Sequence, residues 1–445
     1  MTRTSKRVAA VFAAATLAGG LAACGSDDNK DSGSSESAAP TTASTDVSGS
    51  VSMTGIWSGD EQKSFQAVLD AFEAKYPNVK VKYTSAGDNT ATVLSTAVEG
   101  GNPPDVAAVG QPGLVKEFQE KDALQPLDFA KDTIDAEYPE SLAKLGDIDG
   151  KLYSFVFKAA NKSTVWYNVA AFKNAGVEAP SDWDAFLENA KTIGASGTPA
   201  YSIGGADGWT LTDLFENIYL RQAGADKYDQ LTNHEIAWTD QSVKDALTAM
   251  GQIFSDTKNI VGGTSGALET EFPGSVENVF VDPAKGAQVM EGDFVPGVAA
   301  SKTKLKPETG YNQFPFPSIN GSGPAVVGGG DSIVLFKDSE AGQALVEFLA
   351  SAEAQTVWAK RGGYSSPNTK VAADVYPDAL TKATATAIAS ADTFRFDMSD
   401  LAPAAFGGTA GQGEWKALQD FLQKPDDVDG TAAELEKLAA KAYKN

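Results

Sequence analysis

The chain has 445 residues, with 59 Asp and Glu against 36 Lys and Arg and a formal net charge of −23. This acidic balance argues against nucleic-acid binding, which requires a basic surface. The sequence contains one histidine, His234, and one cysteine, Cys24. It therefore excludes a zinc cluster and catalysis by Ser-His, Cys-His or His-metal groups within the chain, and we expect neither a metal nor a cofactor.

The first 23 residues are typical of a secretory signal peptide. Arg3, Lys6 and Arg7 precede an apolar run over residues 8–17, and small residues follow up to position 23. The run is too short to cross a bilayer, which takes about 20 residues. We therefore expect residues 1–23 to be removed on export.

The tetrapeptide Leu21-Ala22-Ala23-Cys24 resembles a bacterial lipobox, in which the cysteine is acylated and becomes the mature N-terminus. Because the chain has no second cysteine for a disulfide, we predict that Cys24 is lipidated; the alternative is a plain signal peptide with an incidental cysteine. Residues 24–50 are rich in Ser, Asp, Gly, Thr and Ala and predict a flexible linker. The predicted location is the extracellular face of the cytoplasmic membrane, with a lipid anchor.

Strand-like and helical patterns alternate from Val51 onward, and the roughly 395 residues that remain are enough for two lobes. This alternation predicts an α/β fold with parallel strands. The expected strands cover residues 51–57, 79–83 and 105–109. The expected helices are one that begins at a capping box at residues 58–61 and runs to Tyr76, one over residues 90–98, and one from residue 114 onward. Ligands of open α/β sheets bind beyond the carboxyl ends of the strands. The candidates in those segments are Trp57, Ser58, Glu61, Asp88 and Gln111.

Several motifs occur in an order that is typical of one family. They are residues 100–106 (GGNPPDV), 149–153 (DGKLY), 165–168 (VWYN) and 180–183 (PSDW). Together they resemble the extracellular solute-binding proteins of bacterial ABC importers, in the carbohydrate-binding group that includes maltose-binding protein. Residues 158–168 (KAANKSTVWYN) and 395–403 (RFDMSDLAP) look most like the alpha-glucoside-binding branch. The resemblance covers the chain from Val51 to its C-terminus.

The resemblance implies a two-lobe α/β fold, the Venus-flytrap fold of periplasmic binding proteins, with a hinge of chain crossings. The expected N-terminal lobe comprises residues 51–160 and about 313–370, and the C-terminal lobe comprises residues 161–312 and about 371–445. A mono- or oligosaccharide, expected to be an alpha-glucoside such as maltose, sucrose or trehalose, would bind in the cleft between the lobes. The closed protein, acting as a monomer, would deliver this sugar to the transmembrane subunits of an ABC permease.

A sugar is held by aromatic rings against its C–H faces and by charged or amide groups around its hydroxyls. Trp57 closes the first strand, and Trp209 lies in a glycine-rich stretch, where anchoring a loop in the core is the alternative role. Phe294 lies in a segment that resembles the family's aromatic stacking segment, although maltose-binding protein has Trp there. Trp183 and Trp358 follow helical patterns, and we expect them to pack structurally.

Further candidates lie near expected turns and chain crossings. Three glycines precede an expected strand at residues 333–336, and glycine allows a ligand to approach the backbone, unless the stretch is only a mobile turn. Arg395 and Asp397 would share one face of a strand and offer a donor and an acceptor to one sugar, with a surface salt bridge as the alternative. Arg361 follows a helix and faces either the sugar or the solvent. The candidates of this group are Asn161, Glu291, Gly329, Gly330, Asp331, Arg361, Arg395 and Asp397.

Two other functions would use similar residues. A secreted glycosidase also places acidic and aromatic side chains in a cleft, with two carboxylates across the scissile bond. A ligand-binding partner of a sensor, or an adhesin, would share the fold. The resemblance favours a binding protein over an enzyme, with a carbohydrate, the permease and the membrane as partners.

Overall fold

The computed structural model describes residues 46–299, 303–391 and 393–444. The expected signal peptide, Cys24 and the expected linker up to residue 45 lie outside the described residues. No helix in the described part of the chain is both long and apolar enough to span a membrane. The fold is mixed α/β, as the sequence predicts.

The first lobe is built on a six-stranded sheet. Its strands are β1 (Gly49–Gly55), β2 (Val79–Ser85), β3 (Val106–Val109), β6 (Ser154–Asn161), β10 (Ala325–Leu335) and β11 (Thr393–Phe396). The order is β11-β10-β3-β1-β2, and β6 pairs with β10 beside that path. β1 runs parallel to both β2 and β3, which confirms the predicted parallel strands, whereas β10 runs antiparallel to β3 and β6.

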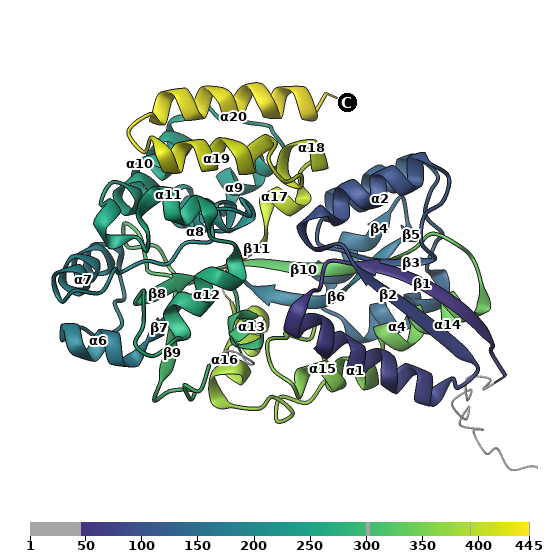
Figure 1. Ribbon diagram of the computed structural model, residues 1–445. Helices are drawn as coiled ribbons and strands as arrows, with labels where there is room; N and C mark the ends of the chain where they lie inside the picture. Colours follow the sequence, from purple (N-terminus) through teal and green to yellow (C-terminus); the bar gives the residue numbers. More distant parts are fainter. Residues whose placement is uncertain (1–45, 300–302, 392, 445) are drawn as a thin grey trace, which may run out of the picture. The chain divides into compact units, whose positions relative to one another are not determined.

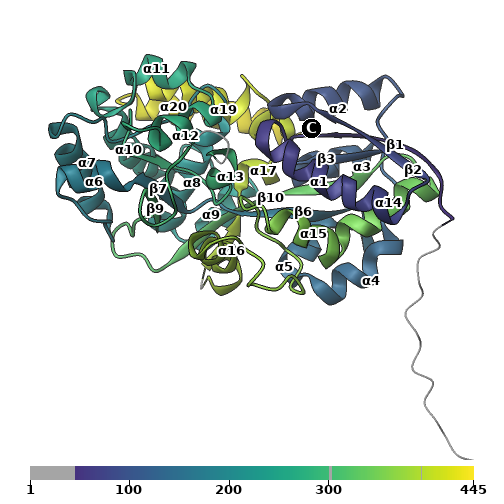
Figure 2. The ribbon, with the colours of Figure 1, turned by 60° about the horizontal axis from the view of Figure 1, so that its bottom comes forward.

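Helices cover both faces of this sheet. They are α1 (Gly59–Lys75), η1 (Gly87–Asn89), α2 (Thr90–Glu99), α3 (Pro112–Glu120), α4 (Asp128–Glu137), α5 (Glu140–Ala143), η2 (Lys144–Gly146), α14 (Glu340–Ala350) and α15 (Ala352–Ala359). Successive residues of a strand point to opposite faces. Val106 and Ala108 of β3 therefore share a core with α1, α14 and α15, while Ala107 and Val109 share another with α2 and α3. Figure 2 shows α1, α14 and α15 on one side of the strands.

Helix α1 shows why the sequence patterns were informative. Phe65, Val68, Leu69 and Phe72 are buried at helical spacing, so one face of the helix packs on the sheet. The helix ends at Lys75, shortly before Pro77, which cannot continue a helix. A short hairpin, β4 (Asp147–Ile148) and β5 (Lys151–Leu152), completes the strands of this lobe.

The second lobe is built on a three-stranded antiparallel sheet in the order β8-β7-β9. Its strands are β7 (Thr164–Asn168), β8 (Gln288–Met290) and β9 (Tyr311–Pro315). Its helices are α6 (Val169–Ala175), α7 (Trp183–Ala195), α8 (Trp209–Ala223), α9 (Ala225–Thr232), α10 (Gln241–Phe254), η3 (Thr257–Asn259), α11 (Gly263–Glu269), α12 (Phe272–Phe280), α13 (Val295–Ala299), α17 (Met398–Leu401), α18 (Ala404–Gly407), α19 (Gly413–Gln423) and α20 (Val428–Ala442). Helix α8 lies against α10 and α19 in the largest core (Figure 1).

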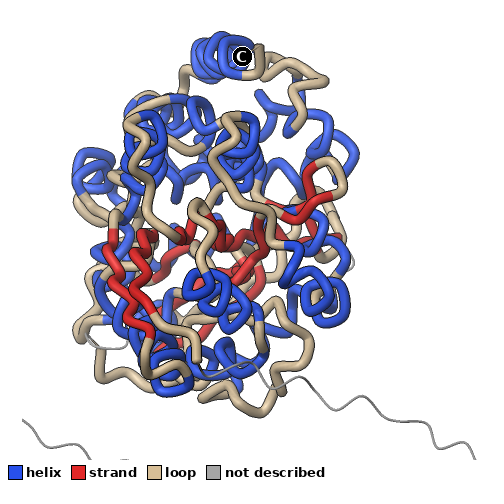
Figure 3. Tube along the Cα trace, turned by 90° about the vertical axis from the view of Figure 1, so that its right-hand side faces the viewer, coloured by secondary structure: helices blue, strands red, loops and turns tan. Residues whose placement is uncertain are grey.

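Three neighbouring segments of the chain link the two lobes. The chain leaves β6 at Asn161 and enters β7 at Thr164, so it crosses from the first lobe to the second between these residues. Strand β10 and the segment from β11 into α17 run beside it, and α16 (Ala379–Ser390) packs on β6. Backbone hydrogen bonds join the three, from Lys162 N to Val327 O at 2.9 Å and from Asp397 N to Gly328 O at 2.7 Å. Figure 3 shows the strands inside a covering of helices.

The structure corrects three local expectations. The three glycines lie inside β10 and not in a loop before it. Trp209 is the first residue of α8 and not part of an irregular stretch. Asp397 lies beyond the end of β11, where it caps α17, so it does not share a strand face with Arg395. Trp183 and Trp358 are buried on helices, as predicted.

Candidate functional site

One cavity of about 480 Å³ is bordered by residues of both lobes. The first lobe contributes the segments that follow β1, β2 and β3, which is where ligands of α/β sheets bind. The second lobe contributes the starts of α8, α12 and α19 and parts of α13 and α17. The sequence-predicted candidates that border it are Trp57, Ser58, Glu61, Asp88, Gln111, Trp209, Phe294, Gly330 and Asp331.

Strand β6 lies along the cavity with one face. Lys158, Ala160 and Lys162 all border it, because alternate residues of an extended chain point the same way. The two lysines are thereby placed near the first lobe's helix α1 and at the crossing into the second lobe. Both are mostly buried, with side chains 6% and 10% exposed.

Lys158 is held by carboxylates of the first lobe. Its Nζ lies 2.6 Å from Oε1 of Glu61, which follows β1 on the first turn of α1. Burial alone would lower the pKa of Lys158, but Glu61 and Asp331 outweigh it and raise that pKa. The ammonium also lies 5.1 Å from the centre of the Phe294 ring of the second lobe.

Asp331 is fixed by Trp57. The Trp57 indole Nε1 donates a hydrogen bond of 2.6 Å to Oδ2 of Asp331. Burial raises the pKa of Asp331, and Lys158 opposes this effect. Trp57 itself is only 1% exposed and packs against Phe65 and Trp358. It therefore presents no free ring face to a ligand, and its contribution is to orient the Asp331 carboxylate.

The second lobe supplies an aromatic wall. The Trp209 ring lies 5.1 Å from the Phe272 ring and 6.1 Å from the Phe294 ring, between centres, and the last two rings are 5.3 Å apart. Phe272 and Phe294 are 6% and 8% exposed, whereas Trp209 is only half-buried. Trp209 is therefore the aromatic side chain of this wall with the most free surface.

Carboxyl groups from both lobes border the cavity. Asp88 comes from the first lobe, and Asp207 and Glu271 come from the second. Burial, helped by Glu271, raises the pKa of Asp88, and a hydrogen bond from Trp209 opposes it. Burial raises the pKa of Asp207 to about 7, although this group accepts a hydrogen bond from the Phe272 backbone N–H.

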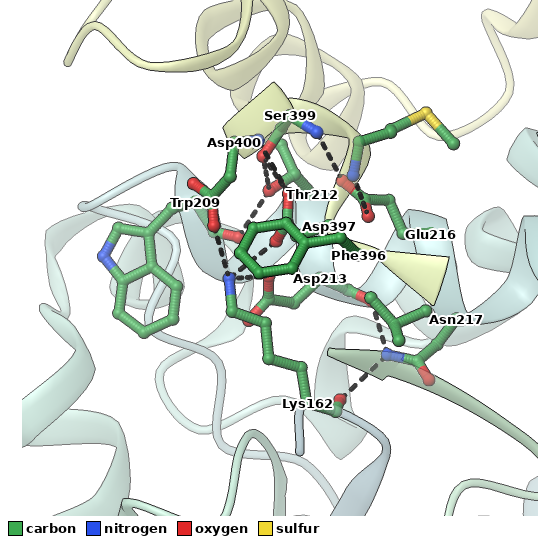
Figure 4. Close-up of polar contacts among 12 residues, drawn as sticks. Lys162, Trp209, Thr212, Asp213, Glu216, Asn217, Phe396, Asp397, Ser399 and Asp400 are labelled. Atoms are coloured by element: carbon green, nitrogen blue, oxygen red, sulfur yellow. Dashed lines mark hydrogen bonds and ion pairs between the residues drawn. The ribbon is translucent and has the colours of Figure 1, made fainter. Parts of the chain in front are cut away.

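Lys162 is the centre of a second charged cluster, which is drawn in Figure 4. Its Nζ lies 3.0 Å from Asp213 Oδ1, 2.6 Å from Asp397 Oδ2 and 3.5 Å from Asp400 Oδ2. Burial opposes the charge on Lys162, but the three carboxyl groups raise its pKa well above the ordinary value. Burial and the Asp397 charge raise the pKa of Asp400, and Lys162 opposes this.

Several predicted candidates lie away from the cavity. Arg361 donates to Ser64 Oγ on the exposed surface, and Arg395 pairs with Asp229 through Nη2 and Oδ2 at 2.9 Å. The salt-bridge alternative for Arg395 is therefore the arrangement found, although its partner is not Asp397. Asp397 is buried outside the cavity and forms an ion pair with Lys162.

The other candidates outside the cavity have local roles. The Asn161 side chain accepts from the Ser163 N–H, which shapes the chain crossing. Glu291 is 2% exposed and does not border the cavity. Gly329 also lies outside it and packs against Lys162, so that a Cβ at this position would lie 2.6 Å from Lys162 Cε.

Sequence reasoning missed several residues that border the cavity. These are chiefly Lys158, Lys162, Asp207, Phe272, Asp400 and Trp415. The two lysines stood in the motif KAANK, at positions that share a strand face, and that spacing was a usable signal. Asp400 and Trp415 had no such signal, because contacts between distant parts of the chain bring them to the cavity.

Two α/β lobes with a cavity of this size between them form a site for a small molecule. The chain belongs to the family described as bacterial extracellular solute-binding proteins, whose family model matches residues 57–356. It is 31% identical to the osmoprotective compounds-binding protein GgtB of Synechocystis over 389 residues, which cover 86% of this chain and 90% of that protein. It is 30% identical to the alpha-glucosides-binding periplasmic protein AglE of Rhizobium meliloti over 391 residues, which cover 85% of this chain and 84% of AglE.

Solved structures share the fold. The bacterial solute receptor AcbH matches with a TM-score of 0.78 and 19% identity, over 88% of this chain and 99% of that one. The GacH receptor of Streptomyces glaucescens matches with a TM-score of 0.68 and 19% identity, over 88% and 99%. The predicted two-lobe fold is thus confirmed. The family and these relatives are binding proteins, so the chain is a receptor and not an enzyme.

Proposed function

We propose that this protein is a lipid-anchored receptor that captures a saccharide, an alpha-glucoside such as maltose, sucrose or trehalose, and delivers it to an ABC permease. The observation that carries the proposal is the pairing of a half-buried Trp209 with charged groups from both lobes around one cavity. An indole face suits the C–H face of a sugar, and the charged groups suit its hydroxyls.

The names of the relatives support this ligand class. AglE is named for binding alpha-glucosides, and GgtB for binding osmoprotective compounds. The solved structures include GacH in complex with acarbose and RafE in complex with raffinose. Alpha-glucosides, acarbose and raffinose are all rich in hydroxyl groups, which the charged groups around the cavity could bind.

The charged groups around the cavity argue against ligands that carry a negative charge. Seven side-chain carboxyl groups and three lysines border it, with no arginine or histidine among the residues that do so. Each of the lysines is paired with a carboxylate, namely Lys63 with Asp60, Lys158 with Glu61, and Lys162 with its cluster. A phosphate or carboxylate on the ligand would meet like charge, which costs affinity. We therefore propose a neutral sugar and not a sugar phosphate or sugar acid.

A thermal-shift screen tests this proposal. A ligand that binds only the folded state raises the melting temperature. We expect a rise with at least one of maltose, sucrose and trehalose, and none with glucose 6-phosphate or glucuronate as anionic controls. A rise with the anions alone, or with none of the neutral sugars, would contradict the proposal.

A further inference from the structure

The Lys162 ammonium lies at different distances from its three carboxyl partners. Its contacts with Asp397 and Asp213 are 2.6 and 3.0 Å, within the usual range for charge-assisted hydrogen bonds, while the contact with Asp400 is 3.5 Å. An ammonium has three N–H donors. Two of them are therefore directed to close partners, and the third is only loosely engaged.

The loosely joined pair is also the pair that borders the cavity. Lys162 and Asp400 border it, while Asp213 and Asp397 do not. The Lys162 and Asp400 side chains are 10% and 13% exposed, against 2% and 0% for Asp213 and Asp397. The Trp209 ring flanks the pair, with its centre 5.7 Å from the Lys162 ammonium (Figure 4).

Resting on the proposed function, we propose that Lys162 and Asp400 form a specificity-determining pair that binds one hydroxyl group of the sugar. The Lys162 ammonium donates a hydrogen bond to the hydroxyl oxygen, and the hydroxyl group donates a hydrogen bond to a carboxyl oxygen of Asp400. A hydroxyl is both a donor and an acceptor, so it satisfies both groups at once. A hydrogen atom at the same carbon satisfies neither, and the site discriminates against a sugar that lacks this hydroxyl.

The same pair connects the ligand to the link between the lobes. Lys162 lies in the crossing between β6 and β7, and Asp400 lies on α17 just after β11. Asp397 positions both, because it accepts from the Asp400 N–H at 2.9 Å and holds the Lys162 ammonium. A hydroxyl bound here touches two of the three linking segments.

The experiment measures affinity by isothermal titration calorimetry in wild type and Asp400→Ala. Its probe is whichever of maltose, sucrose and trehalose gives the largest thermal shift, together with its 2-, 3-, 4- and 6-monodeoxy derivatives on a glucosyl ring. We expect Asp400→Ala to weaken binding of the parent sugar about 10-fold or more. Asp229→Ala, which removes a carboxylate paired with Arg395 outside the cavity, serves as the matched control and should bind as wild type does.

The deoxy sugars separate ligand contact from a merely structural effect. In wild type, one deoxy derivative should bind about 10-fold or more weakly than its parent; in Asp400→Ala, the same two sugars should differ by less than about 3-fold. An unchanged ratio in the variant, or wild-type affinity of Asp400→Ala, would overturn the inference while leaving the proposed function intact. Failure of wild type to bind any of the three disaccharides would overturn both.

Discussion

Gly329 illustrates how a residue outside the cavity shapes it. A Cβ at this position would lie 2.6 Å from Cε of Lys162, whose side chain is pinned by carboxyl groups and has little freedom to move. A clash of this kind costs about 1–3 kcal/mol in a packed interior.

We expect Gly329→Ala to displace the Lys162 side chain, to reduce stability by about 1–3 kcal/mol and to weaken sugar binding. Chemical denaturation and calorimetry measure the two effects. Gly323→Ala is the matched control, since its Cβ would meet no atom within 4 Å. Equal stability and affinity for the two alanine variants would show that the space at Gly329 is unimportant.

The raised pKa of Asp207 should make the stability of the protein depend on pH. Burial raises its pKa from 3.8 to about 7 in the folded protein. Between these values the folded state holds the proton and the unfolded chain has released it, so the free energy of unfolding falls as the pH rises through this window. Asparagine does not ionise, so Asp207→Asn removes this fall in the free energy of unfolding. The amide oxygen of the asparagine can still accept the hydrogen bond from the Phe272 N–H.

In the ligand-free protein, Asp207→Asn should therefore raise the melting temperature on the order of 1–3 °C at pH 8 and have little effect at pH 4. Asp240 gives a control of opposite sign, because hydrogen bonds from Ser242 and Lys227 lower its pKa to about 2. Its stabilising contribution is present above pH 4 and lost as the pH falls, so Asp240→Asn should destabilise at pH 8. A pH-independent effect of Asp207→Asn would refute the account of its burial.

Helix α8 presents Trp209, the most exposed ring of the aromatic wall. Its first residue is Trp209, and Gly208 before it has φ 85°, a conformation that favours glycine. A Cβ on Gly208 would lie 2.7 Å from Cβ of Trp415, so helix α19 also requires glycine here. The start of α8 is thus fixed tightly enough to hold a half-buried indole at the cavity.

Trp209→Ala should weaken binding of a neutral sugar by about 1–3 kcal/mol, because the ring's stacking surface is lost. Calorimetry measures the change. Tyr167→Ala, which removes another half-buried aromatic ring away from the cavity, should leave the affinity unchanged. Wild-type affinity in a folded Trp209→Ala protein would remove Trp209 from the site.

The elements also show what the sequence could and could not predict. Strands β1 to β3 were predictable because their apolar patterns are local. Glu61, Asp88 and Gln111, which follow their carboxyl ends, border the cavity. The partners of Lys162 come from α8, the end of β11 and α17, so no local pattern brings them together. Arg395 was misplaced for the same reason, since its partner Asp229 lies on α9.

Three adjacent segments of the chain join the two lobes, namely the crossing from β6 to β7, strand β10, and the segment from β11 into α17. Groups from both lobes border the cavity, so a sugar that contacts both favours the closed arrangement by differential affinity. The predicted lipidation of Cys24 would keep such a receptor beside its permease.

Cys24→Ala should therefore release the protein from the membrane, or misdirect it, without changing its affinity for sugar. Fractionation of the producing cells followed by immunoblotting measures the location, and calorimetry on purified protein measures the affinity. Continued membrane association of the variant would contradict the predicted anchor. Reduced affinity would contradict the separation of anchor and binding site.

A crystal structure of the protein with its best-binding disaccharide would show whether the cavity beside Trp209 binds a neutral saccharide. We predict electron density for a glucosyl ring against the Trp209 indole, with its hydroxyls on the carboxyl groups and lysines that border the cavity. Sugar density anywhere else on the protein, with this cavity holding none, would contradict the claim.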